Sequence, residues 1–183
     1  MIGMDDQPIN KIEWVDVNKL HSNDYNPNVV LNKEMRLLKL SILKQGWIQP
    51  ILVTQNYEII DGFHRSTLAK GSKEIRQMTG GKVPCVVLNL SEPERMLLTI
   101  RINRAKGNHV AFKMQDIIKT LINDYNIPKE EIARQIGADI TEIDVLYLDD
   151  VFRKYELKEE SLYNQAWEPY KKSERAKMKD GKL

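Results

Sequence analysis

Residues 42–65 read ILKQGWIQPILVTQNYEIIDGFHR and place a helix end, two short strands and a glycine turn in close succession. The first residues of the stretch complete an amphipathic pattern over 31–45, and Gly46 stands where a helix C-terminus favours a residue that tolerates positive φ. The runs 51–54 and 57–60 are rich in β-prone residues and flank a two-residue break, which is typical of strands joined by a tight turn. The stretch therefore predicts a helix, two strands and a sharp turn at its Asp-Gly pair.

Shorter patterns before and after this stretch complete a mixed first half. Residues 12–17 alternate apolar and polar side chains as a half-buried strand does, and the apolar run 83–88 predicts a buried strand. A short helix is expected over 64–70, where the following glycine stops it, and the polar segment 71–82 is expected to be a loop. The sequence therefore predicts an α/β domain within residues 10–90.

Beyond Leu90 the spacing of the apolar residues is helical. Ser91 and Glu94 form a capping box at the start of the first helix. The sequence thus predicts an α+β protein, in which a helical, helix-turn-helix-like region covers 91–158 and a basic tail covers 159–183. The helices are predicted over 92–105, 112–125, 128–136, 140–149 and 151–158.

Composition limits the compartments and partners that we expect. The formal net charge is only +2, but residues 62–119 hold eleven Lys and Arg against four Asp and Glu, which favours an anionic partner there. A single cysteine, Cys85, excludes an internal disulfide and is typical of a reducing compartment. The chain shows neither a signal-peptide pattern nor an apolar run of membrane length, so we expect a cytoplasmic protein without a membrane partner.

The turn Asp61-Gly62-Phe63-His64-Arg65 carries the residues best suited to bind an anion. The helix that follows it presents unpaired backbone N–H groups and the positive end of its dipole. Gly62 lets the backbone approach a ligand closely, and His64 and Arg65 add donors for phosphate oxygens. Asp61 is expected to cap the helix or to help hold a Mg2+ ion. The same residues also suit a plain structural turn, and this alternative stays open.

Together with Gln45-Gly46-Trp47-Ile48-Gln49-Pro50 and Val83-Pro84, the turn resembles the N-terminal domain of ParB proteins, in the ParB/sulfiredoxin-like superfamily. That family carries the pattern S-I-x-x-x-G-I-x-x-P-I-x-V followed by G-x-R-R or D-G-x-H-R, and the resemblance covers residues 12–90. It implies the fold of the family and a bound nucleoside triphosphate, CTP or ATP, with Mg2+ as a candidate companion. The residues expected at the nucleotide are Gln49, Gly62, Phe63, His64 and Arg65.

One activity of the superfamily is excluded by a single residue. Sulfiredoxins are similar to this chain in the G-x-H-R turn, but they require a cysteine where this chain has Phe63. Sulfinic acid repair needs a thiolate at that position. The protein is therefore not expected to be a sulfiredoxin.

A second cationic segment, Arg101–His109, is expected to face the turn. Along the resemblance, the asparagine of the ParB E-N-x-x-R box falls on Asn103 and its arginine on Lys106. The acidic residue of the box falls on Ile102, which puts metal-assisted hydrolysis in the ParB manner in doubt. The segment is also similar to short phage and prophage ParB-like co-activators of the IbrB type. The resemblance adds to the expected phosphate site Arg101, Asn103, Arg104 and Lys106, although cations at a helix C-terminus are favourable in any case.

Residues 126–146 have the spacing of a helix-turn-helix and resemble the central ParB motif. Ala133 gives the close helix contact and Gly137 the turn. The segment 138–150, however, holds five carboxylates and no Lys or Arg, which disfavours its helix as a reader of DNA. DNA contacts are therefore expected from cations elsewhere, at Lys113, Lys119, Lys171, Lys172 and Arg175.

The leading functional hypothesis is a nucleotide-binding, DNA-associated regulatory protein of the ParB-like type, acting as a transcriptional co-regulator or partition-like factor. The alternative is a small enzyme of the same superfamily, an NTPase, small-molecule kinase or nuclease, with Asp61 or His64 as acid or base. A third reading is a scaffold that kept the fold without the nucleotide. The expected partners are a nucleotide, DNA and either a second protein or a second copy, and no resident metal site is expected.

Overall fold

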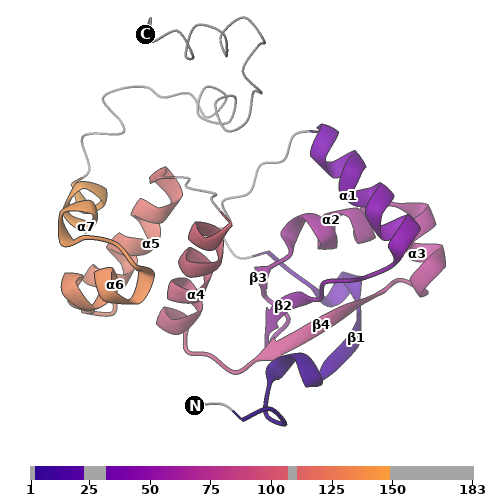
Figure 1. Ribbon diagram of the computed structural model, residues 1–183, viewed down its shortest axis with the longest axis horizontal. Helices are drawn as coiled ribbons and strands as arrows, with labels where there is room; N and C mark the ends of the chain where they lie inside the picture. The colour runs from indigo at the N-terminus through magenta and orange to yellow at the C-terminus, as the bar shows by residue number, and fades with distance from the viewer. Residues whose placement is uncertain (1–2, 23–31, 107–110, 149–183) are drawn as a thin grey trace, which may run out of the picture. The chain divides into compact units, whose positions relative to one another are not determined.

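The computed structural model describes residues 3–22, 32–106 and 111–148. Within them a four-stranded sheet and its covering helices are followed by a helical region (Figure 1). The α+β fold class expected from the sequence is confirmed. Every helix in this part of the chain is too short or too polar to cross a membrane.

The sheet consists of β1 (Ile12–Asp16), β2 (Ile51–Thr54), β3 (Ile59–Asp61) and β4 (Lys82–Leu88), in the order β1-β4-β2-β3. β4 runs antiparallel to β1 and parallel to β2, and β2 runs antiparallel to β3. Consecutive residues of β4 from Val83 to Val86 are buried, so side chains on both faces of this strand are shielded, which explains its nearly continuous apolar sequence. The sheet edge at β3 ends where the Gly62 turn begins.

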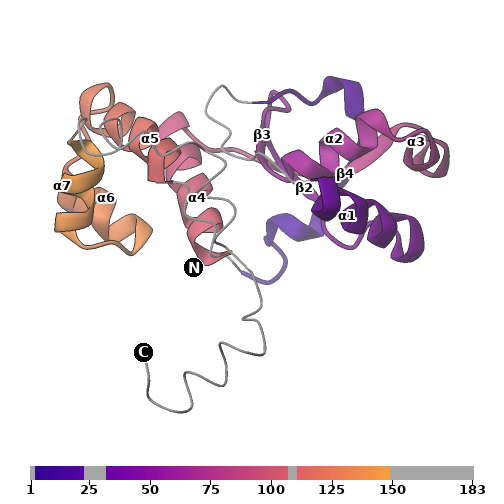
Figure 2. The ribbon, with the colours of Figure 1, turned by 90° about the horizontal axis from the view of Figure 1, so that it is seen from above.

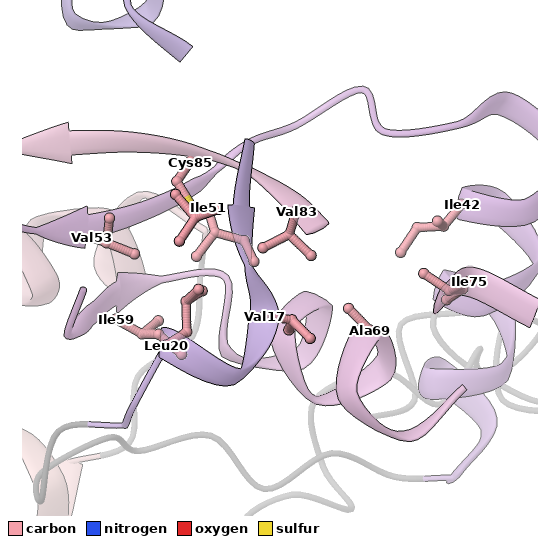
Figure 3. Close-up of a cluster of buried hydrophobic side chains, with 11 residues drawn as sticks. Val17, Leu20, Ile42, Ile51, Val53, Ile59, Ala69, Ile75, Val83 and Cys85 are labelled. Atoms are coloured by element: carbon pink, nitrogen blue, oxygen red, sulfur yellow. The ribbon is translucent and has the colours of Figure 1, made fainter. Parts of the chain in front are cut away.

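Three helices, α1 (Asn32–Gln45), α2 (Phe63–Gly71) and α3 (Lys73–Thr79), bury their apolar sides against one face of the sheet. Figure 3 shows Ile42 of α1 beside Ala69 and Ile75, with the strand residues across from them. This core holds the β3–α2 junction in place. Its buried members are Val15, Val17, Leu20, Ile42, Ile51, Val53, Ile59, Ala69, Ile75, Val83 and Cys85.

Helix α3 corrects the expected loop over 71–82. Ser72 caps α3 by accepting a hydrogen bond from the Ile75 amide at 3.4 Å, and Gly80 ends it in the left-handed conformation at φ 62°. One fully buried residue, Ile75, holds this short helix on the core. Two apolar residues, Ile75 and Met78, are too few to establish a helical period, so the pattern in the sequence was too weak to predict α3.

The second region contains α4 (Glu92–Ala105), α5 (Ala111–Asn123), α6 (Lys129–Ile136) and α7 (Ile140–Tyr147). The predicted capping box is present, since the Ser91 amide donates to the Glu94 carboxylate at 2.8 Å. α6 and α7 are joined at Gly137, which has a φ of 67°. The expected helix over 151–158 and the tail over 159–183 lie outside the described residues, and a DNA-binding helix-turn-helix stays a prediction.

We predict that Ile75→Ala lowers the free energy of unfolding by about 2–4 kcal/mol, because it leaves a cavity under α3. The matched control is Met78→Ala on the same helix, whose side chain is 45% exposed. It is expected to change stability by no more than about 0.5 kcal/mol. Urea unfolding followed by circular dichroism measures both, and equal losses would contradict this account of α3.

Burial also raises the pKa of the Cys85 thiol to about 12. We therefore expect the folded protein to resist alkylation by iodoacetamide at pH 8, since the reactive form is the thiolate. Mass spectrometry should show rapid labelling only after denaturation. Labelling of the native protein at the rate of a free thiol would show that β4 is more open than the structure indicates.

Candidate phosphate-binding site

Gly62 forms the turn between β3 and α2. It is the N-cap residue of α2, has a φ of 100°, and supplies no side chain to cap the first N–H groups of the helix. The first hydrogen bond of the helix runs from the Ser66 amide to the Gly62 carbonyl at 3.0 Å. A Cβ at this position would lie 3.1 Å from Nη2 of Arg65 and 3.2 Å from Cγ1 of Ile51. The turn therefore requires glycine and leaves the helix start without a capping side chain.

Arg65 stabilises the turn through three hydrogen bonds from its guanidinium group. Its Nη1 donates to the carbonyl oxygens of Gln49 at 2.9 Å and Pro50 at 2.7 Å, and its Nη2 donates to Asp61 at 3.0 Å. Burial lowers the pKa of Arg65, while the Asp61 carboxylate acts in the opposite direction. The guanidinium, predicted to bind phosphate directly, is thus held by three protein acceptors in the structure.

Lys106 reaches the turn from the end of α4. Its Nζ donates to Oδ1 of Asp61 at 2.7 Å, so the Asp61 carboxylate lies between two cations. The Lys106 side chain is 47% exposed, whereas that of Asp61 is 17% exposed. The structure therefore brings together the two segments that the sequence paired. The expected capping role of Asp61 is wrong, because Gly62 occupies the N-cap position.

The other predicted residues of α4 divide between two faces of the helix. Asn103 lies one turn before Lys106 and is half-buried, with no side-chain hydrogen bond among the described residues. Arg104 instead donates to Glu142 at 2.5 Å and to the Gly137 carbonyl at 3.2 Å. Arg101 lies 3.4 Å from Oε1 of Gln135. The contacts of Arg101 and Arg104 thus lead to α6 and α7 rather than to the turn.

The remaining residues predicted at the turn have mixed surroundings. His64 is half-buried and meets the Phe63 ring edge to face, with centroids 6.1 Å apart. Phe63 packs against the core, and its carbonyl accepts from the hydroxyls of Ser66 and Thr67. Gln49 is exposed and contributes its backbone carbonyl to Arg65.

Arg95 and Glu58 are part of this arrangement and were not predicted. Arg95 is 6% exposed and forms ion pairs with Glu58, just before β3, and with Glu92 at 3.2 Å. Glu92 in turn accepts from the Tyr125 hydroxyl at 2.5 Å. The available signal was an arginine placed between the acidic first turn of α4 and the apolar run 96–98. These contacts fix the start of α4 beside the strand that leads into the turn.

Of the five cations expected to contact DNA, the structure describes the side chain of Lys119 alone. Lys119 is half-buried on α5, the side chain of Lys113 is not described, and Lys171, Lys172 and Arg175 lie outside the described residues. Two carboxylates of α7, the second helix of the expected helix-turn-helix, form ion pairs. Glu142 pairs with Arg104, and Asp144 pairs with Lys129. The helix therefore presents less unpaired negative charge than its sequence indicates.

No resident metal site emerges from the described side chains. Across residues 3–22, 32–106 and 111–148, no group of three or more His, Cys, Asp or Glu residues gathers to hold an ion. Both carboxylate oxygens of Asp61 accept from cations. The predicted Mg2+ near Asp61 would therefore need further ligands from the nucleotide itself.

Comparison with known proteins identifies this combination of sheet, turn and helices. The model of the ParB N-terminal domain matches residues 3–103, and the chain belongs to this family. It is 36% identical over 166 residues to the uncharacterized protein YbdM of Escherichia coli (strain K12), which covers 88% of this chain and 78% of that protein.

More distant relatives include partition proteins. The probable chromosome-partitioning protein ParB of Rickettsia felis is 26% identical over 134 residues, which are 72% of this chain and 44% of that protein. The chain thus spans less than half the length of that relative. The structure of C-terminally truncated ParB from Caulobacter crescentus, complexed to the centromeric parS site, has the same fold at a TM-score of 0.50 and 21% identity. That alignment covers 79% of this chain and 76% of the other.

We predict that Gly62→Ala lowers the free energy of unfolding by about 1–3 kcal/mol, because the new Cβ is strained at positive φ and crowds Arg65. Gly71→Ala is the matched control within α2, since its Cβ would meet nothing within 4 Å. This control should leave stability unchanged or slightly raised. Thermal and urea unfolding measure the difference, and an unaffected Gly62→Ala protein would contradict the geometry of the turn.

Proposed function

We propose that the Gly62 turn binds the phosphate groups of a nucleoside triphosphate. The observation that carries the proposal is the α2 N-terminus, which has no capping side chain. The ammonium group of Lys106 is held beside it, because it donates to Asp61 directly before the turn. Helix N–H groups and a cation around one turn suit an anion with several oxygens. Membership in the ParB N-terminal domain family supports the same site.

Lys106 is the residue best able to change its partner. It is about half exposed and pairs with one oxygen of Asp61, whereas Arg65 retains the other oxygen. A phosphate that draws Lys106 away would therefore leave Asp61 paired. The negative charge of Asp61 close to a triphosphate is unfavourable, and a Mg2+ ion carried by the nucleotide would reduce that repulsion. We therefore expect binding to be stronger with Mg2+ than without it.

Arg65 supports the site without having to touch the ligand. Its contacts to the carbonyls of Gln49 and Pro50 fix the segment before β2, and its contact to Asp61 fixes the end of β3. The ammonium of a lysine could not replicate this planar fork of donors. In the proposal, Arg65 is a positioning residue, while the backbone of residues 63–65 and Lys106 bind phosphate.

We further propose that the protein acts in association with DNA as a regulatory or partition-like factor. The pair α6–α7 with its Gly137 turn and the relation to partition proteins support this part. Because two carboxylates of α7 pair with cations, this helix repels DNA less than the sequence of α7 implies. An electrophoretic mobility assay with and without nucleotide tests this step. The enzymatic alternative has less support, because the Asp61 oxygens are both engaged by cations.

We predict that calorimetry with CTP, ATP, GTP and UTP in the presence of Mg2+ detects binding of at least one triphosphate. Lys106→Met should weaken that binding about tenfold or more, because a charged donor to phosphate is lost. The matched control is Lys129→Met. Lys129 lies on α6, and its Nζ donates to Oδ1 of Asp144 at 2.6 Å. This control should bind as the wild type does.

Two results would decide against the proposed function. The wild-type protein could bind none of the four triphosphates, in which case the turn is only structural. Alternatively, Lys106→Met and Lys129→Met could weaken binding equally, which would place the nucleotide elsewhere on the chain.

A further inference from the structure

The outer face of α1 exposes large apolar side chains that the core does not use. Leu37 is 60% exposed, Leu40 is 51% exposed and Leu43 is 39% exposed, and they follow one another at intervals of three residues. Ile48, just after the helix, is 74% exposed. The opposite side of α1 already packs into the core through Leu38 and Ile42. The leucines therefore form a second apolar face, separate from the one that folding requires.

The same outer face carries cations and no carboxylate. At about 100° per residue, five positions of α1 whose side chains are described fall within an arc of about 120°. Every one of them is a leucine or a cation, and the one acidic residue of the helix, Glu34, falls outside the arc. The five positions are Arg36, Leu37, Leu40, Leu43 and Lys44. We call this set the α1 outer face.

We propose that the α1 outer face docks an acidic amphipathic helix of a partner protein. Apolar side chains repeated every three or four residues on such a helix would pack between the leucines. A carboxylate beside them would meet the exposed ammonium group of Lys44, so that charge complementarity sets the register. The exposed leucines give the contact its area, and a cluster of this kind on a monomer commonly marks an interaction site.

The arrangement of charges favours a helix over a lipid surface. Helices that lie on membranes keep their cations on a polar face and their apolar residues on another. On α1 the cations and leucines alternate within one arc, and the remaining apolar side is committed to the core. α1 also packs beside α2 and α3 (Figure 2). This surface does not depend on the nucleotide site.

The test uses a fluorescent synthetic peptide of about four helical turns, with leucines at i, i+3, i+7 and i+10 and glutamates between them. Anisotropy titration should give a weak affinity, in the micromolar to roughly hundred-micromolar range of small transient interfaces. A control peptide with lysines in place of the glutamates should not bind. Leu40→Ser should weaken binding of the acidic peptide about tenfold or more, and Lys44→Glu should weaken it measurably.

Trp14→Ser is the matched protein control, because Trp14 is 53% exposed on β1 and lies outside the α1 outer face. It should bind the acidic peptide as the wild type does, and circular dichroism should show that all variants stay folded. The proposal is overturned if neither peptide binds, or if Leu40→Ser has no effect. It is also overturned if light scattering finds a dimer that Leu40→Ser dissolves, or if anionic phosphatidylserine vesicles bind this face while the peptide does not.

Discussion

The guanidinium of Arg65 joins three short pieces of backbone that the candidate site needs at once. Its donors reach the carbonyls of Gln49 and Pro50 and the carboxylate of Asp61, so the start of β2 and the end of β3 are held against the first turn of α2. Because the group is largely buried, its charge has to be met by these acceptors. Gly62 lies directly against it, which explains why a side chain there would disturb the whole junction.

Helix α4 depends on this junction at both of its ends. Arg95 pairs with Glu58 just before β3, and Lys106 pairs with Asp61, the last residue of β3. Two ion pairs therefore fix α4 along this short strand. The contact at Arg95 is buried, whereas that at Lys106 is half exposed. A buried pair is costly to break, and an exposed pair exchanges easily with another anion. The ion pair of Arg95 therefore holds the start of α4 in place, whereas Lys106 at the end of the helix can exchange Asp61 for another anion.

Much of this could be predicted from the sequence, because glycine turns and helical spacing are local signals. The Gly62 turn, the order of strands and helices apart from α3, and the pairing of the turn with Lys106 were all accessible, the last through family resemblance. The bracing contacts of Arg65 were not, since they join backbone carbonyls that carry no sequence signal. Arg104 was expected at the phosphate but pairs with Glu142, because two faces of one helix carry similar cations. That assignment depends on packing, which a sequence pattern does not show.

The proposed function requires that the helix start at Gly62 and the end of α4 form one phosphate site. The most direct measurement is a titration of the 15N-labelled protein with a Mg2+ triphosphate, followed by amide chemical shifts. We expect the largest shifts to occur together at residues 62–65 and 103–106. Shifts confined to α5–α7, or no shifts at all with any of the four triphosphates, would contradict it.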